Sequence, residues 1–303
     1  MSGYQFHTHT MARISDSPPR ELRFAAALAG YPDPVPTTLT DDFDPAVVQQ
    51  IQARLDEVET EHGVAVVWAV ESGSRAWGFP SPDSDHDCRF LHVRPLEDYL
   101  SPWRPRDVIE TPLDAVLDVN GWDLIKAVQL ATASNATVAE WLQSPFVYRG
   151  DSDFAAELLQ LCREVVSLPA ITRHYHHVGR SHWNRSGAGE GNTIALKKLF
   201  YAIRPAAALH WMRTHCSPLP PMHLPTLLAE APPETDVVDA VTELIAAKAT
   251  TRELGEGVVP EPIRRFVMHE FTLAEDAGSR PAPKEYALAR ATFIDLVRRF
   301  APS

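Results

Sequence analysis

Apolar side chains recur along the chain with two different periods, and each period predicts one kind of secondary structure. The first helical spacing falls on Val47, Ile51, Leu55 and Val58. Asp44 can cap the start of this helix, Pro45 suits its first turn, and Gly63 suits a left-handed end. The β-branched run VAVVWAV at 64–70 then has the length and composition of a buried strand.

Two further strands and a helical stretch follow before the pattern breaks. The segment HDCRFLHV, residues 86–93, alternates between apolar and polar positions and predicts a second strand. Residues 114–124 predict a third strand, which ends near Asp118. The spacing over 122–142 is helical, and Pro145 marks a break.

Beyond residue 153 strand signals are lacking and helical spacing dominates. The helical runs reach Leu168 and then cover 195–212, 237–249 and 286–300, with proline-rich loops between them. This order of elements predicts an α/β (α+β) domain followed by a helical one. We therefore divide the chain into a partly ordered N-terminal arm (1–42), an α/β domain (43–150) and a helical domain (151–303).

The composition is that of a globular protein, and it argues against a membrane span. Of 303 residues, 45% are hydrophobic and 22% are charged. There is no apolar run of about 18 residues, and the N-terminus lacks the apolar stretch of a signal peptide. Cys88, Cys162 and Cys216 are scattered, which favours reduced thiols and leaves no CxxC-type metal site. We expect a cytoplasmic protein without membrane contact.

Two carboxylates one position apart are the first candidate for chemistry. Asp85 and Asp87 would point to the same face of a strand, where their mutual repulsion calls for a cation between them. Mg²⁺ prefers such oxygen ligands and keeps positions open for phosphate oxygens. Asp118, in the next strand, is the best candidate for a third carboxylate, and Asp83 and Asp123 are the runners-up.

The Gly73-Ser74 turn supplies a second half to this site. It follows the buried strand directly, and a glycine there lets the backbone approach a ligand closely. The N–H groups of the turn and the Ser74 hydroxyl can hold phosphate oxygens. The turn and the carboxylates together predict a site for a metal-bound triphosphate.

These residues carry a family resemblance. GSRAWG followed by SDHDCRF resembles the Gly-Ser…Asp-x-Asp signature of the DNA polymerase β-like nucleotidyltransferase superfamily. More narrowly, the chain resembles a bacterial and phage family of predicted nucleotidyltransferases associated with RNA repair. The narrower likeness rests on DVNGWDLIKAVQLATASNATVAEWLQSPFVY, YHHVGRSHW and KKLFYAIRPAAALHWM. It runs from about Val64 to the C-terminal helices and does not cover the arm before Asp42.

The resemblance implies a polymerase-β-like palm with a mixed sheet, followed by a helical region. It also implies a role for each motif residue. Gly73 and Ser74 would contact the phosphates, and Asp85 and Asp87 would bind the metals. Asp118 would be the third metal-binding carboxylate and would help to activate the attacking hydroxyl.

Positive charge is concentrated in one segment, although the formal net charge of the chain is −12. This basic segment, residues 171–213, holds Arg173, Arg180, Arg185, Lys197, Lys198, Arg204 and Arg213. Lys197, Tyr201 and Arg204 fall at helical spacing on one face, and Lys198 is adjacent. We expect these cations to bind the nucleotide phosphates and Tyr201 to stack on the base or ribose.

Together these features predict a metal-dependent nucleotidyltransferase. It would move a nucleoside monophosphate from an NTP, with ATP among the candidates, to an acceptor hydroxyl and release pyrophosphate, using Mg²⁺ or Mn²⁺. The family favours an RNA 3′ end, reached through the basic segment 171–213. A protein hydroxyl, giving AMPylation, or a small molecule remains open as acceptor. A catalytically degenerate palm that senses nucleotides or binds proteins is the alternative from another class, and it would lack a carboxylate.

Overall fold

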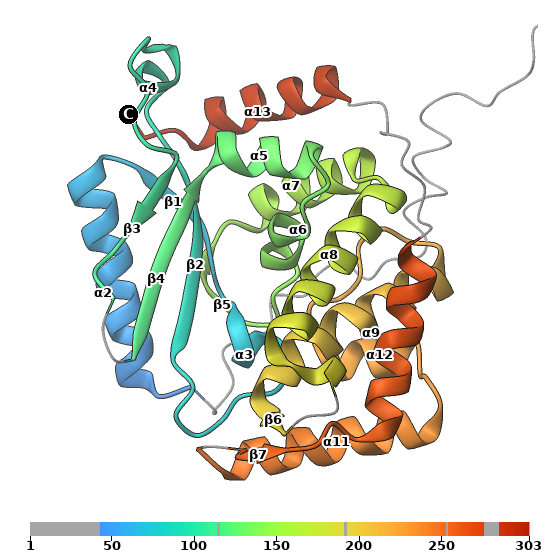
Figure 1. The fold of residues 1–303 in the computed structure, drawn as a ribbon. Coiled ribbons are helices and arrows are strands. Elements are labelled where there is room, and N and C mark those ends of the chain that lie inside the picture. The colour runs from blue at the N-terminus through green and yellow to red at the C-terminus, as the bar shows by residue number, and fades with distance from the viewer. Residues whose placement is uncertain (1–42, 114–115, 191–192, 253, 276–284, 303) are drawn as a thin grey trace, which may run out of the picture. The chain divides into compact units, whose positions relative to one another are not determined.

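A five-stranded sheet organises the part of the chain that the computed structural model describes, which is residues 43–303 without 114–115, 191–192, 253, 276–284 and 303. The predicted arm, 1–42, lies outside the described residues. The strands are β1 (Ala65–Glu71), β2 (His86–Val93), β3 (Val108–Glu110), β4 (Leu117–Asp123) and β5 (Val147–Gly150). Their order is β3-β4-β2-β1-β5 (Figure 1). Strands β2 and β4 are parallel and the other neighbours are antiparallel, so the sheet is mixed, as predicted.

Helices cover both faces of this sheet. Helix α2 (Pro45–His62) lies on one face, and α5 (Leu124–Thr132), α6 (Ala136–Leu142) and α7 (Ser152–Val165) lie on the other (Figure 1). The predicted ends of α2 are confirmed. The Asp44 carboxylate accepts a hydrogen bond from the Ala46 N–H at 2.8 Å, and Gly63 ends the helix with φ 60°.

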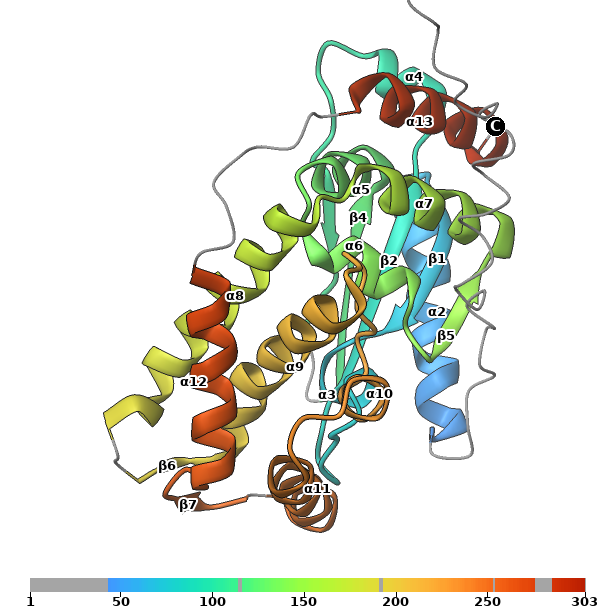
Figure 2. The ribbon, with the colours of Figure 1, turned by 90° about the vertical axis from the view of Figure 1, so that its right-hand side faces the viewer.

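The chain beyond β5 is almost entirely helical. Its further helices are α8 (Leu168–Ser186), α9 (Phe200–His215), α10 (Leu224–Glu230), α11 (Thr235–Thr250), α12 (Glu261–Glu275) and α13 (Tyr286–Phe300). Shorter elements beyond β5 are the 3-10 turns η2 (Ala188–Glu190) and η3 (Leu196–Leu199) and the strand pair β6 (Ile194–Ala195) and β7 (Glu256–Gly257), and the short helices α3 (Gly73–Ala76) and α4 (Leu96–Leu100) precede β5. Helices α8, α9 and α12 lie side by side (Figure 2). Among the described residues, no helix combines the length and apolarity needed to cross a lipid bilayer.

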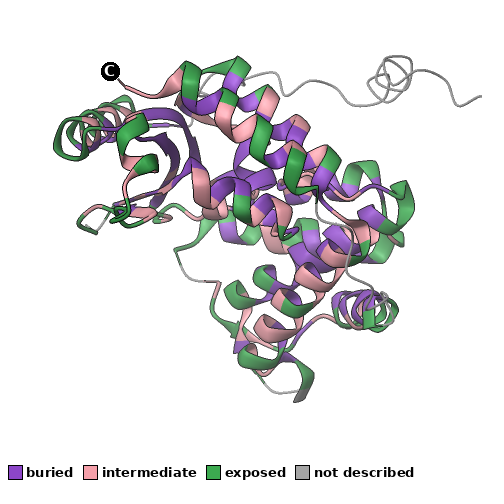
Figure 3. Ribbon diagram, turned by 90° about the horizontal axis from the view of Figure 1, so that it is seen from above, coloured by how far each residue is buried: buried purple, intermediate pink, exposed green. Residues whose placement is uncertain are grey.

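Two hydrophobic cores flank the sheet. The smaller one lies between α2 and the sheet and includes Ile51, Leu55, Val66, Phe90, Leu117 and Val119. The larger one starts on the opposite face, with Leu91 and Val93, and continues without interruption to Phe200 and Phe271 in the helices. In Figure 3 buried positions occupy the strands and the inward faces of the helices. The domain boundary at residue 150 stays a prediction, and this core passes across it.

The third strand differs from its predicted course. It was expected to end near Asp118, but β4 begins at Leu117 and runs to Asp123, so Asp118 lies near its start. Gly121 explains the continuation, because its α-carbon faces the Phe90 ring and a Cβ there would stand 2.1 Å from a ring carbon. The short strands β3 and β5 were not predicted. The latter follows Pro145, where the pattern indicated only a break.

Candidate active site

The turn after β1 is fitted against the acids at the start of β2. Gly73 has φ +62°, and a Cβ at this position would stand 1.9 Å from Oδ2 of Asp87. The Ser72 N–H also donates to the Asp87 carbonyl at 2.8 Å. Only a glycine allows this backbone conformation and this distance together, so the turn and the acid occupy one site.

Hydroxyl groups gather beside the turn. The Ser74 hydroxyl donates to Oγ of Ser84 at 2.9 Å, and the Ser81 N–H donates to the same oxygen at 2.9 Å. Arg75 donates to the carbonyls of Ser84, at 2.6 Å, and Asp85, at 3.2 Å. These bonds hold the loop between α3 and β2 against the turn. Because α3 is only four residues long, its dipole is small, and any anion here would depend on the polar groups of the loop.

Asp87 and Asp118 lie side by side on the two parallel strands. They are register partners in the β2–β4 pair. Side chains alternate along each strand, and Leu117 and Val119 pack into the core beneath α2. Asp87 and Asp118 therefore face the opposite side, toward the helices. Asp85 precedes β2 and is exposed.

A guanidinium group joins the two carboxylates. Nη2 of Arg89 lies 2.8 Å from Oδ1 of Asp87 and 2.7 Å from Oδ2 of Asp118. Burial raises the pKa of Asp87, the charge of Arg89 opposes the rise, and the charges of Asp85 and Asp118 add to it. The two acids therefore form a partly buried, negatively charged pair that already attracts one cation.

The runner-up acids lie elsewhere. Asp123 is buried at the far end of β4, where its carboxylate caps α5 by accepting from the Ile125 N–H at 2.8 Å. It also accepts from Nε of Arg94 at 2.9 Å and from the Tyr99 hydroxyl at 3.0 Å. Asp83 is exposed. The structure thus brings Asp118, and not Asp123, beside Asp87.

A buried acid that the sequence did not single out lies beneath this pair. Glu71 ends β1 and is fully buried. Its Oε1 accepts from the Asp87 N–H at 3.1 Å, and its Oε2 accepts from the Tyr148 hydroxyl. Burial raises the pKa of Glu71 to about 8. A carboxyl at the end of an otherwise apolar strand is the signal that could have marked it.

Aromatic side chains border the acids on the helical side. Tyr201 of α9 is 42% exposed, and burial followed by the charges of Asp87 and Asp85 raises its pKa. Its ring stacks on His182 with centroids 5.3 Å apart and meets the Trp77 ring edge-on at 5.9 Å. We call Trp77, His182 and Tyr201 the aromatic shelf. The Trp77 and Tyr201 rings are perpendicular, and the shelf lies beside the short helix that the Gly73-Ser74 turn begins.

Arg204, predicted to bind phosphates, is buried behind this shelf. Its Nη1 lies 2.8 Å from Oε1 of Glu140, and its guanidinium lies over the Trp77 ring at 4.3 Å. The Tyr175 hydroxyl donates to the same Glu140 oxygen at 2.7 Å. Although burial alone would raise the pKa of Glu140, the charge of Arg204 holds it below its usual value. Arg204 therefore contacts the turn through Trp77.

The other predicted cations lie at the start of α9. Lys197 and Lys198 are both exposed on η3. Lys197 precedes Tyr201 by four positions, and its charge opposes the rise in the pKa of Tyr201 and adds to the fall in the pKa of Lys248. Within the basic segment, ion pairs join Arg180 to Glu275, Arg204 to Glu140 and Arg213 to Glu270.

A buried lysine from α11 also reaches the site loop. Nζ of Lys248 donates to the Phe79 carbonyl and lies over the rings of Phe79 and Phe200, at 5.3 Å and 5.9 Å. Burial lowers the pKa of Lys248. No pattern in the sequence marks this contact, because Lys248 lies in an ordinary amphipathic helix far along the chain.

The donor set fits a divalent ion in chemical type. Asp87 and Asp118 offer the hard oxygens that Mg²⁺ prefers. Both carboxylates form ion pairs with Arg89, so the two acids already bind one cationic group. Across the described ranges, however, no three acidic, histidine or cysteine side chains stand together as a preformed metal site. Asp85 would have to turn toward the pair to complete one.

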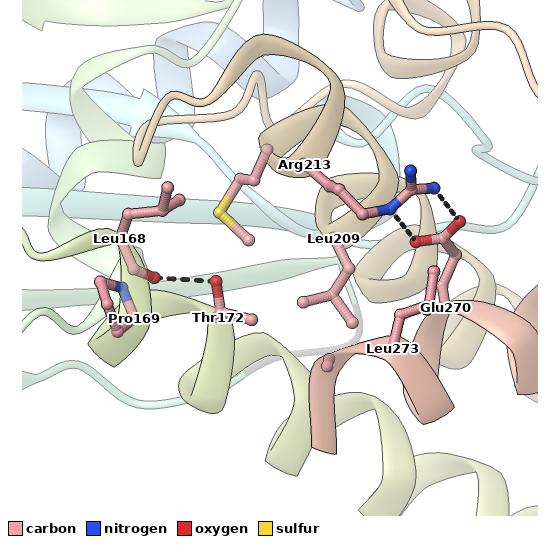
Figure 4. A pocket seen from close by; sticks show the side chains of 9 residues that line it. Leu168, Pro169, Thr172, Leu209, Arg213, Glu270 and Leu273 are labelled. Carbon is pink, nitrogen blue, oxygen red and sulfur yellow. Dashed lines mark hydrogen bonds and ion pairs between the residues drawn. The ribbon is translucent and has the colours of Figure 1, made fainter. Parts of the chain in front are cut away.

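A separate pocket of about 260 Å³ lies between α8, α9 and α12 (Figure 4). Its walls are mainly apolar, with Leu168, Leu209 and Leu273 among them, and the Arg213–Glu270 ion pair lies at one side. None of its lining residues belongs to the acids, the turn or the aromatic shelf. We assign it no part in the candidate chemistry.

The comparison with known proteins agrees with the family that the sequence motifs resemble. A family model described as the RNA repair pathway DNA polymerase beta family (RlaP) matches residues 47–295. The chain is 37% identical over 230 residues to YcgL, an uncharacterized protein of Bacillus subtilis (strain 168), and the alignment covers 76% of this chain and 87% of that protein. A solved nucleotidyltransferase-like protein from Exiguobacterium sibiricum 255-15 is 12% identical and has a TM-score of 0.28, with 82% of this chain and 87% of that one covered. The two chains overlap over most of their length, but the TM-score is too low for this likeness to support an inference.

Proposed function

Because the chain belongs to the RNA repair pathway DNA polymerase beta family, whose members are polymerase-β-like nucleotidyltransferases, we propose that it transfers a nucleoside monophosphate from an NTP to an RNA 3′ hydroxyl in the cytoplasm. The observation that supports this most directly is the fit of Gly73 against Asp87, with Asp118 as the register partner of Asp87. A phosphate turn and an acid pair are thereby joined at one point, which is the arrangement that nucleotidyl transfer needs.

At the α-phosphorus the reaction forms one bond and breaks one. The acceptor oxygen attacks the α-phosphorus, the bond from that phosphorus to the bridging oxygen breaks, and pyrophosphate leaves. Asp118 is placed to receive the proton of the attacking hydroxyl, since its carboxylate faces the same side of the sheet as Asp87. Its contact with Arg89 would have to loosen for that oxygen to accept a proton.

The nucleotide has complementary surroundings on both sides of the acids. The backbone of Gly73 and the hydroxyls of Ser74 and Ser84 would bind phosphate oxygens. Tyr201, on the exposed side of the aromatic shelf, would stack on the base or ribose. Lys197 and Lys198 are exposed at the start of α9 and would add positive charge near the phosphates.

Divalent cations complete this proposal. Asp85, Asp87 and Asp118 would hold Mg²⁺ or Mn²⁺. Such an ion, when bound, would neutralise the triphosphate and stabilise the charge that develops on pyrophosphate.

Transfer of labelled nucleotide tests the proposed function. The full chain is incubated with each α-labelled NTP, Mg²⁺ or Mn²⁺, and RNA that ends in a 3′ hydroxyl. RNA with a blocked 3′ end and the Asp87→Asn variant are the controls. Label on the free 3′ end alone supports the proposal, whereas label on a protein or small molecule added in its place would change the acceptor. Nucleotide binding without any transfer would favour the degenerate, nucleotide-sensing module.

A further inference from the structure

Arg89 occupies the space between the two carboxylates that face the helices. Its Nη2 donates to Asp87 and Asp118, and its Nη1 donates to the Asp118 carbonyl at 2.7 Å and to the Cys88 carbonyl at 3.1 Å. The side chain is 19% exposed. It comes from the same strand as Asp87, two positions on, so the strand itself aims it at the pair.

Each carboxylate oxygen of Asp87 and Asp118 already has a neighbour in this arrangement. Oδ1 of Asp87 and Oδ2 of Asp118 share the Arg89 donor. Oδ1 of Asp118 accepts from the Asn120 amide, and Oδ2 of Asp87 faces the Gly73 backbone. A divalent ion bridging Asp87 and Asp118 would stand where the guanidinium now stands. Both cannot bind the same two oxygens, because they would repel each other in a site with little water.

We propose that Arg89 is a built-in counterion that holds the Asp87–Asp118 pair together until a divalent cation displaces it from at least one carboxylate. This inference rests on the proposed function, because it concerns the same acids. Arg89 acts here as a positioning residue. It keeps two like charges in register without metal, and it sets how readily metal enters.

Displacement has a consequence for the order of loading. A half-buried guanidinium that loses its carboxylates needs another anion, and the triphosphate is the anion expected beside the phosphate turn. Free divalent cations therefore bind weakly, and a cation that arrives with a nucleotide binds well. Metal binding and nucleotide binding are coupled through Arg89.

Mn²⁺ binding without nucleotide tests the competition directly. Free Mn²⁺ is measured by electron paramagnetic resonance during titration of the full chain and of Arg89→Met. We expect Arg89→Met to bind Mn²⁺ at least about tenfold tighter, a factor that corresponds to about 1.4 kcal/mol. Arg264→Met is the matched control. It changes the net charge equally, but Arg264 is exposed on α12 and pairs with Glu261, so its Mn²⁺ affinity should stay within about twofold of the wild type.

Thermal unfolding tests the coupling. Mn²⁺ alone should raise the Tm of the wild-type chain little, and Mn²⁺ with a non-hydrolysable NTP analogue should raise it by more than the two separate shifts combined. In Arg89→Met, Mn²⁺ alone should already give a large shift. Adding Asp87→Asn to Arg89→Met should remove that shift, which locates the ion at the acid pair.

Equal Mn²⁺ affinity in the wild type and Arg89→Met, or weaker binding in the variant, would overturn the inference and make Arg89 a fixed support of the acids. If Arg89→Met does not fold, Arg89→Lys replaces it. A lysine keeps the charge but cannot reach all four acceptors, so a smaller gain in Mn²⁺ affinity is expected. Wild-type nucleotidyl transfer without that gain refutes only the inference. Absence of both transfer and nucleotide-dependent Mn²⁺ binding refutes the proposed function as well.

Discussion

Gly73 and Asp87 are in direct contact: a Cβ on Gly73 would stand 1.9 Å from a carboxylate oxygen of Asp87. The two residues lie at the ends of a loop, and the sequence of that loop does not determine how far apart they are. Their contact fixes the phosphate turn relative to the acid pair. A side chain at position 73 would have to move either the turn or the carboxylate.

Gly73→Ala should therefore abolish most of the nucleotidyl transfer, by roughly 10²-fold or more, since misplacement of a reacting group by about 1 Å has effects of that size. Gly63→Ala is the control. Gly63 has nearly the same φ, +60°, but nothing lies within 4 Å of a Cβ there. Both variants should lose about 1–2 kcal/mol of stability from the left-handed backbone, measured by urea unfolding. Equal transfer rates in the two variants would show that the Asp87 contact is unimportant.

Asp118→Asn should lower turnover by roughly 10² or more and leave the metal-free affinity for NTP and the unfolding midpoint nearly unchanged, because the change removes a charge and preserves the shape. Asp123→Asn should instead lower stability by about 1–3 kcal/mol, since Asp123 is buried and accepts bonds from Arg94, Tyr99 and the start of α5. Steady-state kinetics and thermal unfolding separate the two effects. Loss of turnover in Asp123→Asn alone would transfer the catalytic role to that residue.

Glu71 should lower the free energy of unfolding as pH rises from about 6.5 to 8. Burial raises the pKa of Glu71 to about 8 from 4.5, so between these values the folded protein holds a proton that the unfolded chain has released. Histidines whose pKa burial lowers act in the opposite direction, among them His86, to about 4, and His92, to about 3, because the unfolded chain still holds part of their protons near pH 6.5. These histidines are the same in Glu71→Gln, so the stability of the wild type relative to Glu71→Gln should fall by about 2 kcal/mol over this interval. Metal-free urea unfolding at both pH values provides the measurement. An equal change in the free energy of unfolding with pH in the wild type and Glu71→Gln would exclude Glu71 as the cause.

Arg204→Ala should destabilise the protein by about 3–5 kcal/mol, because it leaves the buried Glu140 carboxylate without its ionic partner. The double variant Glu140→Ala, Arg204→Ala removes both charges and should recover part of that loss. Calorimetric unfolding of the two variants gives the comparison. Normal stability of Arg204→Ala, together with a raised Kd for NTP, would instead support a direct contact between Arg204 and the phosphates.

Lys197→Ala should weaken NTP binding by about tenfold, and Lys198→Ala by about twofold or less. The charge of Lys197 acts on Tyr201 and Lys248 at the site, and a phosphate contact of this kind is worth about 1–2 kcal/mol. Equilibrium titration with a fluorescent NTP analogue measures both variants. The reverse ranking would assign the phosphate contact to Lys198.

The sequence predicted the elements whose signals are local. Helix α2 has its cap, its first-turn proline and its terminal glycine within the segment itself, and β2 and α13 start and end at the predicted residues. The short strands β3 and β5 escaped prediction because a few residues carry too little periodicity. Strand β4 was expected to end near Asp118 but continues to Asp123 through Gly121, where the Phe90 ring leaves no room for a side chain.

For the candidate site, the sequence located the motif residues and missed most of their partners. Gly73, Asp87 and Asp118 come together in the structure as the signature predicted. The burial of Arg204 could not be predicted, because its partner Glu140 lies 64 positions away on another helix. Helical spacing grouped Arg204 with Tyr201, but the helix turns one of them into the core and leaves the other exposed.

The bond from Lys248 to the Phe79 carbonyl spans 169 positions of the chain. During synthesis the strands and the phosphate turn leave the ribosome long before α11 does, since the chain emerges from its N-terminus. Until then the loop from Phe79 to Ser84 lacks the anchor that this lysine provides. A nascent or truncated chain that ends before Lys248 thus carries all of the acids beside a loop without this anchor, and the proposed nucleotide site would be completed only late in translation.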